Sequence, residues 1–402
     1  MFLEIVLAVL LGIAAGIITG LIPGVHINLI SIILVSISSY FLGFTSPLTL
    51  AVFIISMAIT HTFLDAIPSI FLGAPDSDMA LGVLPGHRLL LKGKGYEAVK
   101  LTVIGSFLSL LFTLILIPIM IPIVPLFYTF IEPFIAYILI LVVLFMILSS
   151  KGAKKLWSLF VFLISGVLGL IVLNWPNLDQ PLFPMLSGLF GISTLLISLV
   201  QNSRIPKQKF TETIFVKTKN KVKAISAAVF SGSLTGIFPG LGAAQAAVIS
   251  MQLVGNIGDY GFMIMIGGIN TVNFVFSLVT LYTLEKARNG AIVAVMQIIE
   301  SIDLTHLLVF LFIALLVGGI AAFLALKITR IFAKFVTRID YKKLSIGVIA
   351  FISLLVIYFS GLMGFLVLIT STAIGMIAPL KGVKRSNAMG CLLLPVILFF
   401  IL

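Results

Sequence analysis

Charged residues and cysteine are both scarce in this chain. Asp, Glu, Lys and Arg together make up 9% of the 402 residues, whereas hydrophobic residues make up 61%. A soluble domain carries about a quarter charged residues, so the composition excludes a soluble globular protein and indicates a polytopic membrane protein. The single cysteine, Cys391, excludes an internal disulfide and a cysteine-cluster metal site.

The N-terminal part of the chain lacks basic residues. No Lys or Arg precedes Arg88, and Glu4 stands where a signal peptide would carry positive charge, so the first apolar run is expected to belong to the mature protein. Most Lys and Arg residues gather in five clusters, at 88–100, 151–155, 204–223, 327–343 and 381–385. Basic clusters between apolar runs are typical of cytoplasmic loops. The net charge of +12 therefore reports membrane topology and gives no support for a nucleic-acid partner.

Signatures of enzymes are also missing. The chain contains no H-E-x-x-H zinc motif, no G-x-S-x-G nucleophile elbow and no P-loop. We therefore predict a protein that is not an enzyme and that carries no resident metal or cofactor.

Apolar runs fill the chain, and a membrane span needs about 20 such residues. We predict an all-α polytopic fold with about seven hydrophobic segments in each half. The predicted segments are 3–22, 25–44, 48–73, 100–122, 134–150, 156–174 and 184–200, then 224–238, 241–255, 261–284, 304–327, 344–359, 361–379 and 387–402. The predicted domains are an N-terminal repeat at 1–200, a basic cytoplasmic linker at 201–223 and a C-terminal repeat at 224–402.

The distribution of charge predicts opposite orientations for the two halves. The loops expected at 122–132 and 174–184 contain acid and proline but no Lys or Arg, as expected outside the cell. Counting segments from the basic clusters places both termini on the extracytoplasmic side of the cell membrane, and the second half begins at the cytoplasmic linker. The halves then form an inverted-topology repeat. The segments at 224–238 and 241–255 are short, which leaves open whether the first pair in each half spans the membrane or re-enters.

One nine-residue motif occurs twice. Residues 16–24 and 232–240 both read G-x-x-T-G-[LI]-[IF]-P-G, with five identities in nine positions. Proline and glycine break a helix, and matching breaks in two halves point to the binding site of a transporter. Helix N-termini at such breaks would aim backbone N–H groups at an anion. Alternatively, the glycines spaced by four are a small-xxx-small pattern that only lets helices approach closely.

Polar residues at and beside the two breaks are therefore candidate substrate ligands. The predicted substrate-binding residues are Thr19, Gly20, Pro23, Gly24, His26, Asn28, Thr235, Gly236, Pro239, Gly240 and Gln245.

Other polar residues stand inside apolar segments and are candidates for a coupling ion. His61 and Asp65 would share one helix face, and an ionisable residue within a span is a functional candidate. Asp65 could bind a proton or sodium ion, or could pair with His61 at a buried helix contact. Asn270 and Asn273 could coordinate sodium, or could join helices by hydrogen bonds. We predict Asp65, Asn270 and Asn273 as the coupling-ion residues.

The motif pairs and one further stretch resemble a known family, the large membrane subunit of tripartite tricarboxylate transporters (TctA-type permeases). The resemblance rests on Gly16–Gly24, Gly232–Gly242 and Ile67–Leu108; within the last, residues 86–98 are similar to the family's G-Y-P-x-x-x-x-G segment. The chain departs from the family pattern at Pro75-Asp76, where the family has P-G, and at Pro85, where it has an acid.

The resemblance implies an ion-coupled carboxylate permease with duplicated halves. We therefore expect a secondary-active transporter of an organic anion, driven by Na⁺ or H⁺ through alternating access between the paired breaks. The family also has a small membrane subunit and an extracytoplasmic binding protein as partners, and membrane lipids surround the chain. A homodimer is compatible with the sequence. The alternatives are a transporter of a lipid-linked phosphate, such as polyprenyl phosphate, and a membrane scaffold that transports nothing.

Overall fold

The computed structural model describes residues 2–22, 27–36, 38–73, 79–200, 205–238, 241–287, 289–299, 301–336 and 341–401. Within these ranges the chain forms helices and no strand, which confirms the predicted all-α class. Eight of the described helices are long and apolar enough to cross a membrane.

The first half contains both long helices and short helical pieces. Its elements are α1 (Phe2–Leu21), α2 (Ile27–Ser36), α3 (Ser38–Phe41), α4 (Pro47–Leu64), α5 (Ala66–Phe71), η1 (Ala80–Gly82), α6 (Val83–Leu91), α7 (Gly95–Ile131), η2 (Glu132–Phe134), α8 (Ile135–Leu148), α9 (Lys154–Leu173), α10 (Leu182–Leu186), η3 (Ser187–Ile192) and α11 (Ser193–Val200).

The second half follows a non-helical stretch at 205–217. Its elements are α12 (Thr218–Ile237), α13 (Ala243–Val254), α14 (Gly258–Leu284), α15 (Gly290–Ile298), α16 (Leu304–Val336), α17 (Tyr341–Leu380), η4 (Arg385–Met389) and α18 (Gly390–Ile401).

One loop expected from the sequence is helical in the structure. The expected loop at 122–132 is wrong, because α7 continues to Ile131 and contains Pro118, Pro122 and Pro125. Membrane helices tolerate proline because neighbouring groups satisfy the freed backbone atoms. The segments expected at 344–359 and 361–379 are confirmed as two helices, which share the label α17 and are separated by a kink at Gly361, where φ is 64° and the backbone is not helical.

The buried centre of the molecule is built around α4 and α14. About 94% of the most apolar window of the α4–α5 segment is buried, and 89% of that of α14, compared with 28% for α17. A helix that is apolar all round and buried all round belongs to a protein core and does not face lipid. Polar side chains on α4 and α14 are therefore enclosed by protein.

Helix α1 packs on α4 in the first half in the same way as α12 packs on α14 in the second half. A methyl carbon placed on Gly16 would lie 2.5 Å from the carbonyl oxygen of Met57, and one on Gly20 would lie 2.9 Å from Cβ of Leu64. The corresponding positions on α12, Gly232 and Gly236, meet Val272 and Phe276 of α14 at 2.7 and 2.8 Å. Small residues let α1 approach α4, and α12 approach α14, closely enough for backbone contact.

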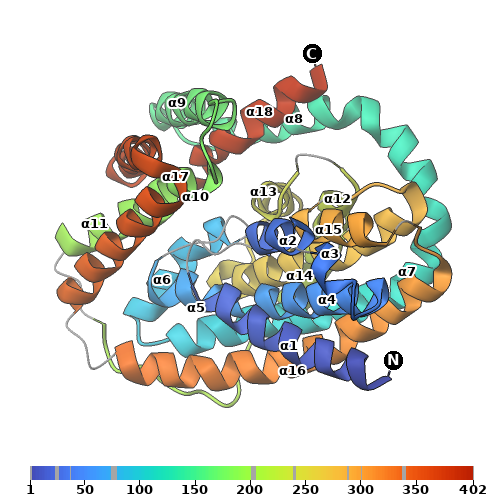
Figure 1. Ribbon diagram of the computed structural model, residues 1–402. Coiled ribbons are helices and arrows are strands. Elements are labelled where there is room, and N and C mark those ends of the chain that lie inside the picture. Colours follow the sequence, from blue (N-terminus) through green and yellow to red (C-terminus); the bar gives the residue numbers. More distant parts are fainter. Residues whose placement is uncertain are drawn as a thin grey trace.

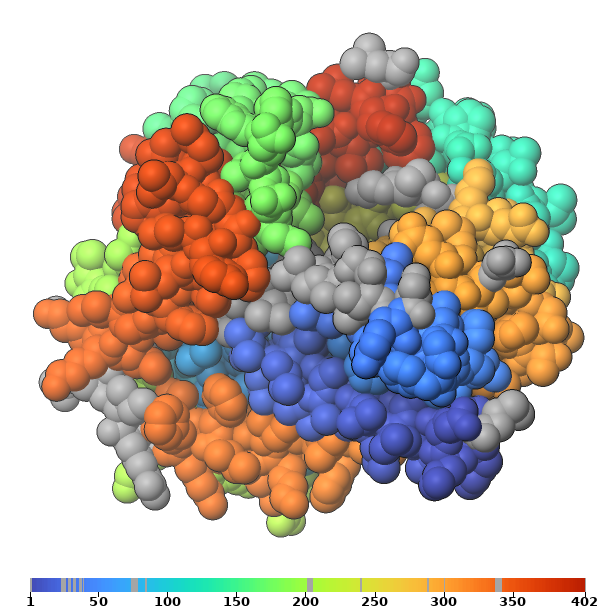
Figure 2. All heavy atoms as spheres, viewed as in Figure 1, coloured from blue at the N-terminus to red at the C-terminus, as the bar shows by residue number. Residues whose placement is uncertain are grey.

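The two halves build one bundle. Figure 1 shows α1 and α4 beside α14, α15 and α16, and Figure 2 shows the N-terminal residues in blue between orange and gold residues of the second half. Helices α8 to α11, α17 and α18 form an arc along one side of this central bundle (Figure 1).

Candidate substrate and ion site

The end of α1 meets α4 through a buried polar contact. Thr19, in the last turn of α1, is 5% exposed, and its hydroxyl oxygen lies 3.2 Å from Nδ1 of His61 on α4. The Thr19 hydroxyl also lies 3.3 Å from the carbonyl oxygen of Gly16. The structure thus places a predicted substrate residue beside the histidine at the end of α4.

An acid–amide pair joins the two halves of the chain. Asp65 stands at the junction of α4 and α5, and its Oδ2 accepts a hydrogen bond of 2.6 Å from Nδ2 of Asn270 on α14. Both residues are 2% exposed. Two of the three predicted coupling-ion residues are therefore in direct contact, although 205 positions separate them in sequence.

Hydroxyl groups extend this polar layer. Thr62 of α4 and Thr271 of α14 are buried, and their hydroxyl oxygens lie 3.3 Å apart. Asn273, one turn beyond Asn270, is partly exposed. The layer offers carboxylate, amide and hydroxyl oxygens, which are the ligands that hard cations prefer. No group of three or more His, Cys, Asp or Glu residues suited to a metal ion occurs among the residues the structure describes.

The break in the second half is held by local hydrogen bonds. The hydroxyl of Thr235 donates to the carbonyl oxygen of Gly232 at 2.8 Å, and the backbone N–H of Gly242 donates to Oε1 of Gln245 at 3.0 Å. The carbonyl oxygen of Gly236 accepts from Thr280 at 2.9 Å. These contacts close the end of α12 and cap the start of α13, so they give Thr235 and Gln245 a positioning role at the break.

The helix ends themselves are where the duplicated motif predicts them. Helix α1 ends at Leu21 and α2 begins at Ile27, while α12 ends at Ile237 and α13 begins at Ala243. Five predicted residues, Pro23, Gly24, His26, Pro239 and Gly240, lie outside the described residues, and so does the side chain of Asn28.

Comparison with known proteins identifies a family for this chain. Residues 6–390 match the family described as the tripartite tricarboxylate transporter TctA family. The chain belongs to the TctA family. This TctA-family chain is also 32% identical to an uncharacterized protein of Methanocaldococcus jannaschii, MJ1079, over 362 residues, which cover 87% of this chain and 88% of the relative. No solved structure matches it.

Membership of the TctA family confirms the resemblance expected from the motif pairs. TctA is a transporter family, so the chain is a component of a transporter of the tricarboxylate type. The eight candidate spans among its described helices make it a multi-pass membrane protein. The family's description as tripartite implies partner subunits.

Sequence reasoning missed a contact at the end of α12 in this TctA-family protein. The ring of Tyr128 on α7 stacks on Phe238, with centroids 5.9 Å apart and planes 21° apart. Lys286 Nζ lies 4.4 Å above the Tyr128 ring and donates to its hydroxyl at 3.2 Å, and that hydroxyl donates to Glu132. The only sequence signal was a charged residue after α14, which by itself does not indicate an aromatic partner on α7.

Proposed function

We propose that the protein is a secondary-active transporter of an organic anion, a di- or tricarboxylate, coupled to Na⁺ or H⁺. The observation that carries this proposal is the buried contact between Asp65 and Asn270, which joins the two halves at the centre of the bundle. Ionisable residues enclosed within membrane spans are costly and mark ion or substrate pathways. Membership of the TctA family supports the same function.

In this proposal Asp65 is the site of the coupling ion. Either its carboxylate takes up a proton, or it binds Na⁺ together with the amide oxygen of Asn270 and the hydroxyls of Thr62 and Thr271. Both events remove negative charge from an enclosed site, and the Asn270 amide can adjust because it offers a donor and an acceptor. Asn273, one turn away, is the third residue assigned to this site.

The substrate anion would bind where the broken helices end. Thr19 and His61 lie at the end of α1, and Thr235 and Gln245 lie at the corresponding end of α12 and start of α13. The backbone N–H groups at the start of α13 carry partial positive charge that favours an anion.

We further propose that the halves are inverted repeats and that the pair α12–α13 re-enters the membrane. In support, α13 folds back along α12, since Ser250 donates to Ser231 at 2.6 Å. The segments on either side of this pair both contact the first turns of α7. Thr211 of the linker before α12 accepts a hydrogen bond from Lys100, and Tyr260 at the start of α14 donates one to Glu97, so the pair begins and ends near the same part of α7. Alternating access would move one repeat against the other.

A ligand screen on purified protein tests the substrate class. A ligand that binds only the folded state raises its stability, by about 2.7 kcal/mol at a concentration 100 times its Kd. We expect citrate or succinate to raise the melting temperature, and Na⁺ or lower pH to increase that effect. Stabilisation by a polyprenyl phosphate alone would replace this proposal with transport of a lipid-linked phosphate, and no stabilisation by any anion would favour a scaffold.

A further inference from the structure

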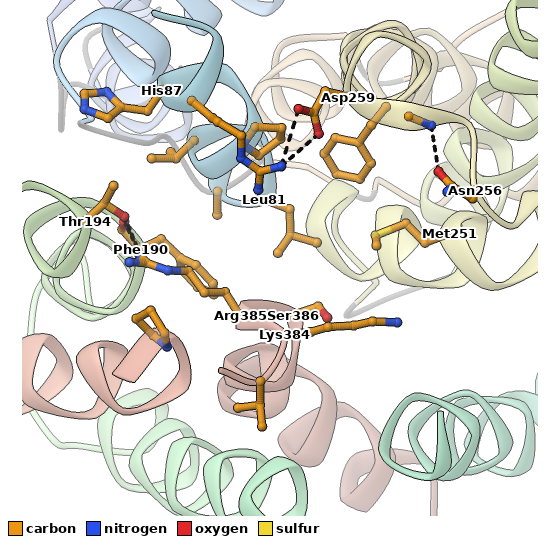
Figure 3. A pocket seen from close by; sticks show the side chains of 18 of the residues that line it. Leu81, His87, Phe190, Thr194, Met251, Asn256, Asp259, Lys384, Arg385 and Ser386 are labelled. Carbon is orange, nitrogen blue, oxygen red and sulfur yellow. Dashed lines mark hydrogen bonds and ion pairs between the residues drawn. The ribbon is translucent and has the colours of Figure 1, made fainter. Parts of the chain in front are cut away.

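A cavity of about 1040 Å³ lies away from the Asp65 layer, between the central bundle and the arc. The bundle contributes residues 80–91 and the turn from α13 to α14, and the arc contributes residues of α8, η3, α11 and the segment 379–386. Of the predicted substrate and ion ligands that the structure describes, none lines it. Figure 3 shows Leu81, Met251 and Asp259 on one side of this space, with Phe190, Arg385 and Ser386 on the other.

Arg385 is the unusual residue of this cavity. It is 8% exposed, and its Nη1 donates to the carbonyl oxygen of Phe190 at 3.5 Å and to the hydroxyls of Ser193 and Thr194. Its Nε has no partner in the described parts of the chain. Nor does any described carboxylate lie within ion-pair distance of Arg385; the partners of Nη1 are all neutral.

A buried guanidinium with only neutral partners has lost water without gaining a counter-ion, which is costly. The backbone around it is also irregular. Phe190 lies in η3, a stretch of π-helix over Ser187–Ile192, and such single-turn stretches are frequent at functional sites.

The charges around the cavity do not balance. Among the described residues that line it, three are basic, Arg88, Lys384 and Arg385, and one is acidic, Asp259, which lies 3.2 Å from Arg88. The described lining therefore carries two positive charges more than negative ones. His87, which also lines the cavity, adds no charge near neutral pH, because burial lowers its pKa to about 4.

We propose that this cavity binds a doubly charged oxyanion, a carboxylate or phosphate, with Arg385 as its principal ligand. A planar guanidinium pairs with two oxygens of such a group. The unpartnered Nε of Arg385 is enclosed by protein in this structure, and a small movement of the side chain would let it supply that geometry together with a neighbouring nitrogen. Lys384, which is exposed at the rim, holds the second charge. The apolar walls, which include Phe190, Phe262 and Met251, receive the uncharged part of the ligand.

This site is additional to the Asp65 layer, and the proposal does not depend on the transport mechanism. Its charge is offered by residues of the arc, whereas the Asp65 layer belongs wholly to α4, α5 and α14. A protein that fails to transport, such as one carrying Asp65→Asn, is expected to keep the anion site.

Equilibrium binding to purified protein tests the role of Arg385. The probes are citrate, inorganic phosphate and nanodiscs that contain phosphatidic acid. Arg385→Met is expected to weaken binding of the preferred probe by about 10- to 100-fold, the range of charge-assisted hydrogen bonds to a buried group. Arg385→Lys keeps the charge but loses the paired donors, and is expected to lie between that variant and the wild type. Lys381→Met is the matched control, because Lys381 lies four residues earlier, stacks on Trp157 and does not line the cavity.

A protection experiment keeps the proposal testable if Arg385→Met does not fold. Ser198 lines the cavity, and the native thiol, Cys391, is fully buried, so Ser198→Cys introduces a single reactive cysteine. We expect the anion to slow modification of Cys at 198 by a charged thiol reagent at least fivefold, and Arg385→Lys to weaken that protection. Ser301→Cys, at an exposed position that does not line the cavity, should react equally with and without anion.

The arms of these experiments also identify the source of the ligand. Protection by citrate or phosphate in solution indicates a soluble anion, and protection only by phosphatidic acid indicates a lipid headgroup; either result supports the oxyanion site. Absence of protection by all three probes, or protection and affinity that are unchanged in Arg385→Lys and Arg385→Met, would overturn it.

Discussion

The crossing of α7 and α14 leads to a prediction that links packing to the Asp65 layer. A methyl carbon placed on Gly105 of α7 would lie 1.9 Å from the carbonyl oxygen of Ile264, whereas ordinary contact begins at 3.4 Å. Gly105→Ala must therefore separate the two backbones by about 1.5 Å. The same crossing holds the hydrogen bond from Ser106 to the carbonyl oxygen of Gly267 at 2.9 Å, one turn before Asn270.

The expected cost can be worked out from these contacts. Overpacking of a tight core costs roughly 1–3 kcal/mol, and loss of the Ser106 hydrogen bond adds about 1 kcal/mol. The higher helix propensity of Ala than of Gly offsets about 1 kcal/mol of this loss in the free energy of unfolding. The net loss of about 1–3 kcal/mol corresponds to a fall of roughly 2–10 °C in the melting temperature of a protein of moderate size.

The assay is thermal unfolding of purified protein, with Gly319→Ala as the control. Gly319 lies in α16, and a methyl group placed on it meets no atom within 4 Å. Gly319→Ala should therefore leave the melting temperature unchanged or raise it slightly. Equal melting temperatures for Gly105→Ala and Gly319→Ala would refute the account of this crossing.

Two further predictions concern contacts that sequence reasoning did not find. Gln208→Ala should speed tryptic cleavage of the linker severalfold, because the Gln208 side chain accepts a hydrogen bond from the backbone N–H of Gly95 at 2.7 Å and donates one to the carbonyl oxygen of Leu90 at 3.1 Å. Thr213→Ala, at an exposed linker position, should leave the cleavage rate unchanged. Equal cleavage rates for the two variants would contradict the anchoring role of Gln208. Tyr128→Ala should lower the melting temperature several times more than Tyr128→Phe, because only the first removes the ring stacked on Phe238. Similar falls in melting temperature for the two variants would mean that the hydroxyl contact with Lys286, and not the stacked ring, supplies the stabilisation by Tyr128.

Much of the architecture could be predicted from the sequence, because membrane spans and helix breaks leave local signals. Pro23-Gly24 and Pro239-Gly240 predicted the ends of α1 and α12, and the apolar runs predicted the long helices. The prolines of α7 misled the prediction for 122–132, since a proline stops a helix in water more reliably than inside a protein-lined membrane segment.

The candidate site was only partly predictable, for a physical reason. Asp65 and Asn270 could each be selected, because polar residues inside apolar helices are conspicuous, but their contact depends on how α4 packs on α14. Arg385 looked like one more member of a basic loop cluster. Its burial against η3 arises from tertiary packing, and no periodic pattern in the sequence reports it.

The most direct test of the central claim is ion-driven carboxylate uptake into proteoliposomes by wild-type protein, Asp65→Asn and Asp303→Asn. Asp303 is an exposed acid that contacts His306 and lies outside the Asp65 layer, so it serves as the matched control. The account predicts that a Na⁺ or proton gradient stimulates uptake in the wild type and in Asp303→Asn but not in Asp65→Asn. Full gradient-stimulated uptake by Asp65→Asn would contradict it.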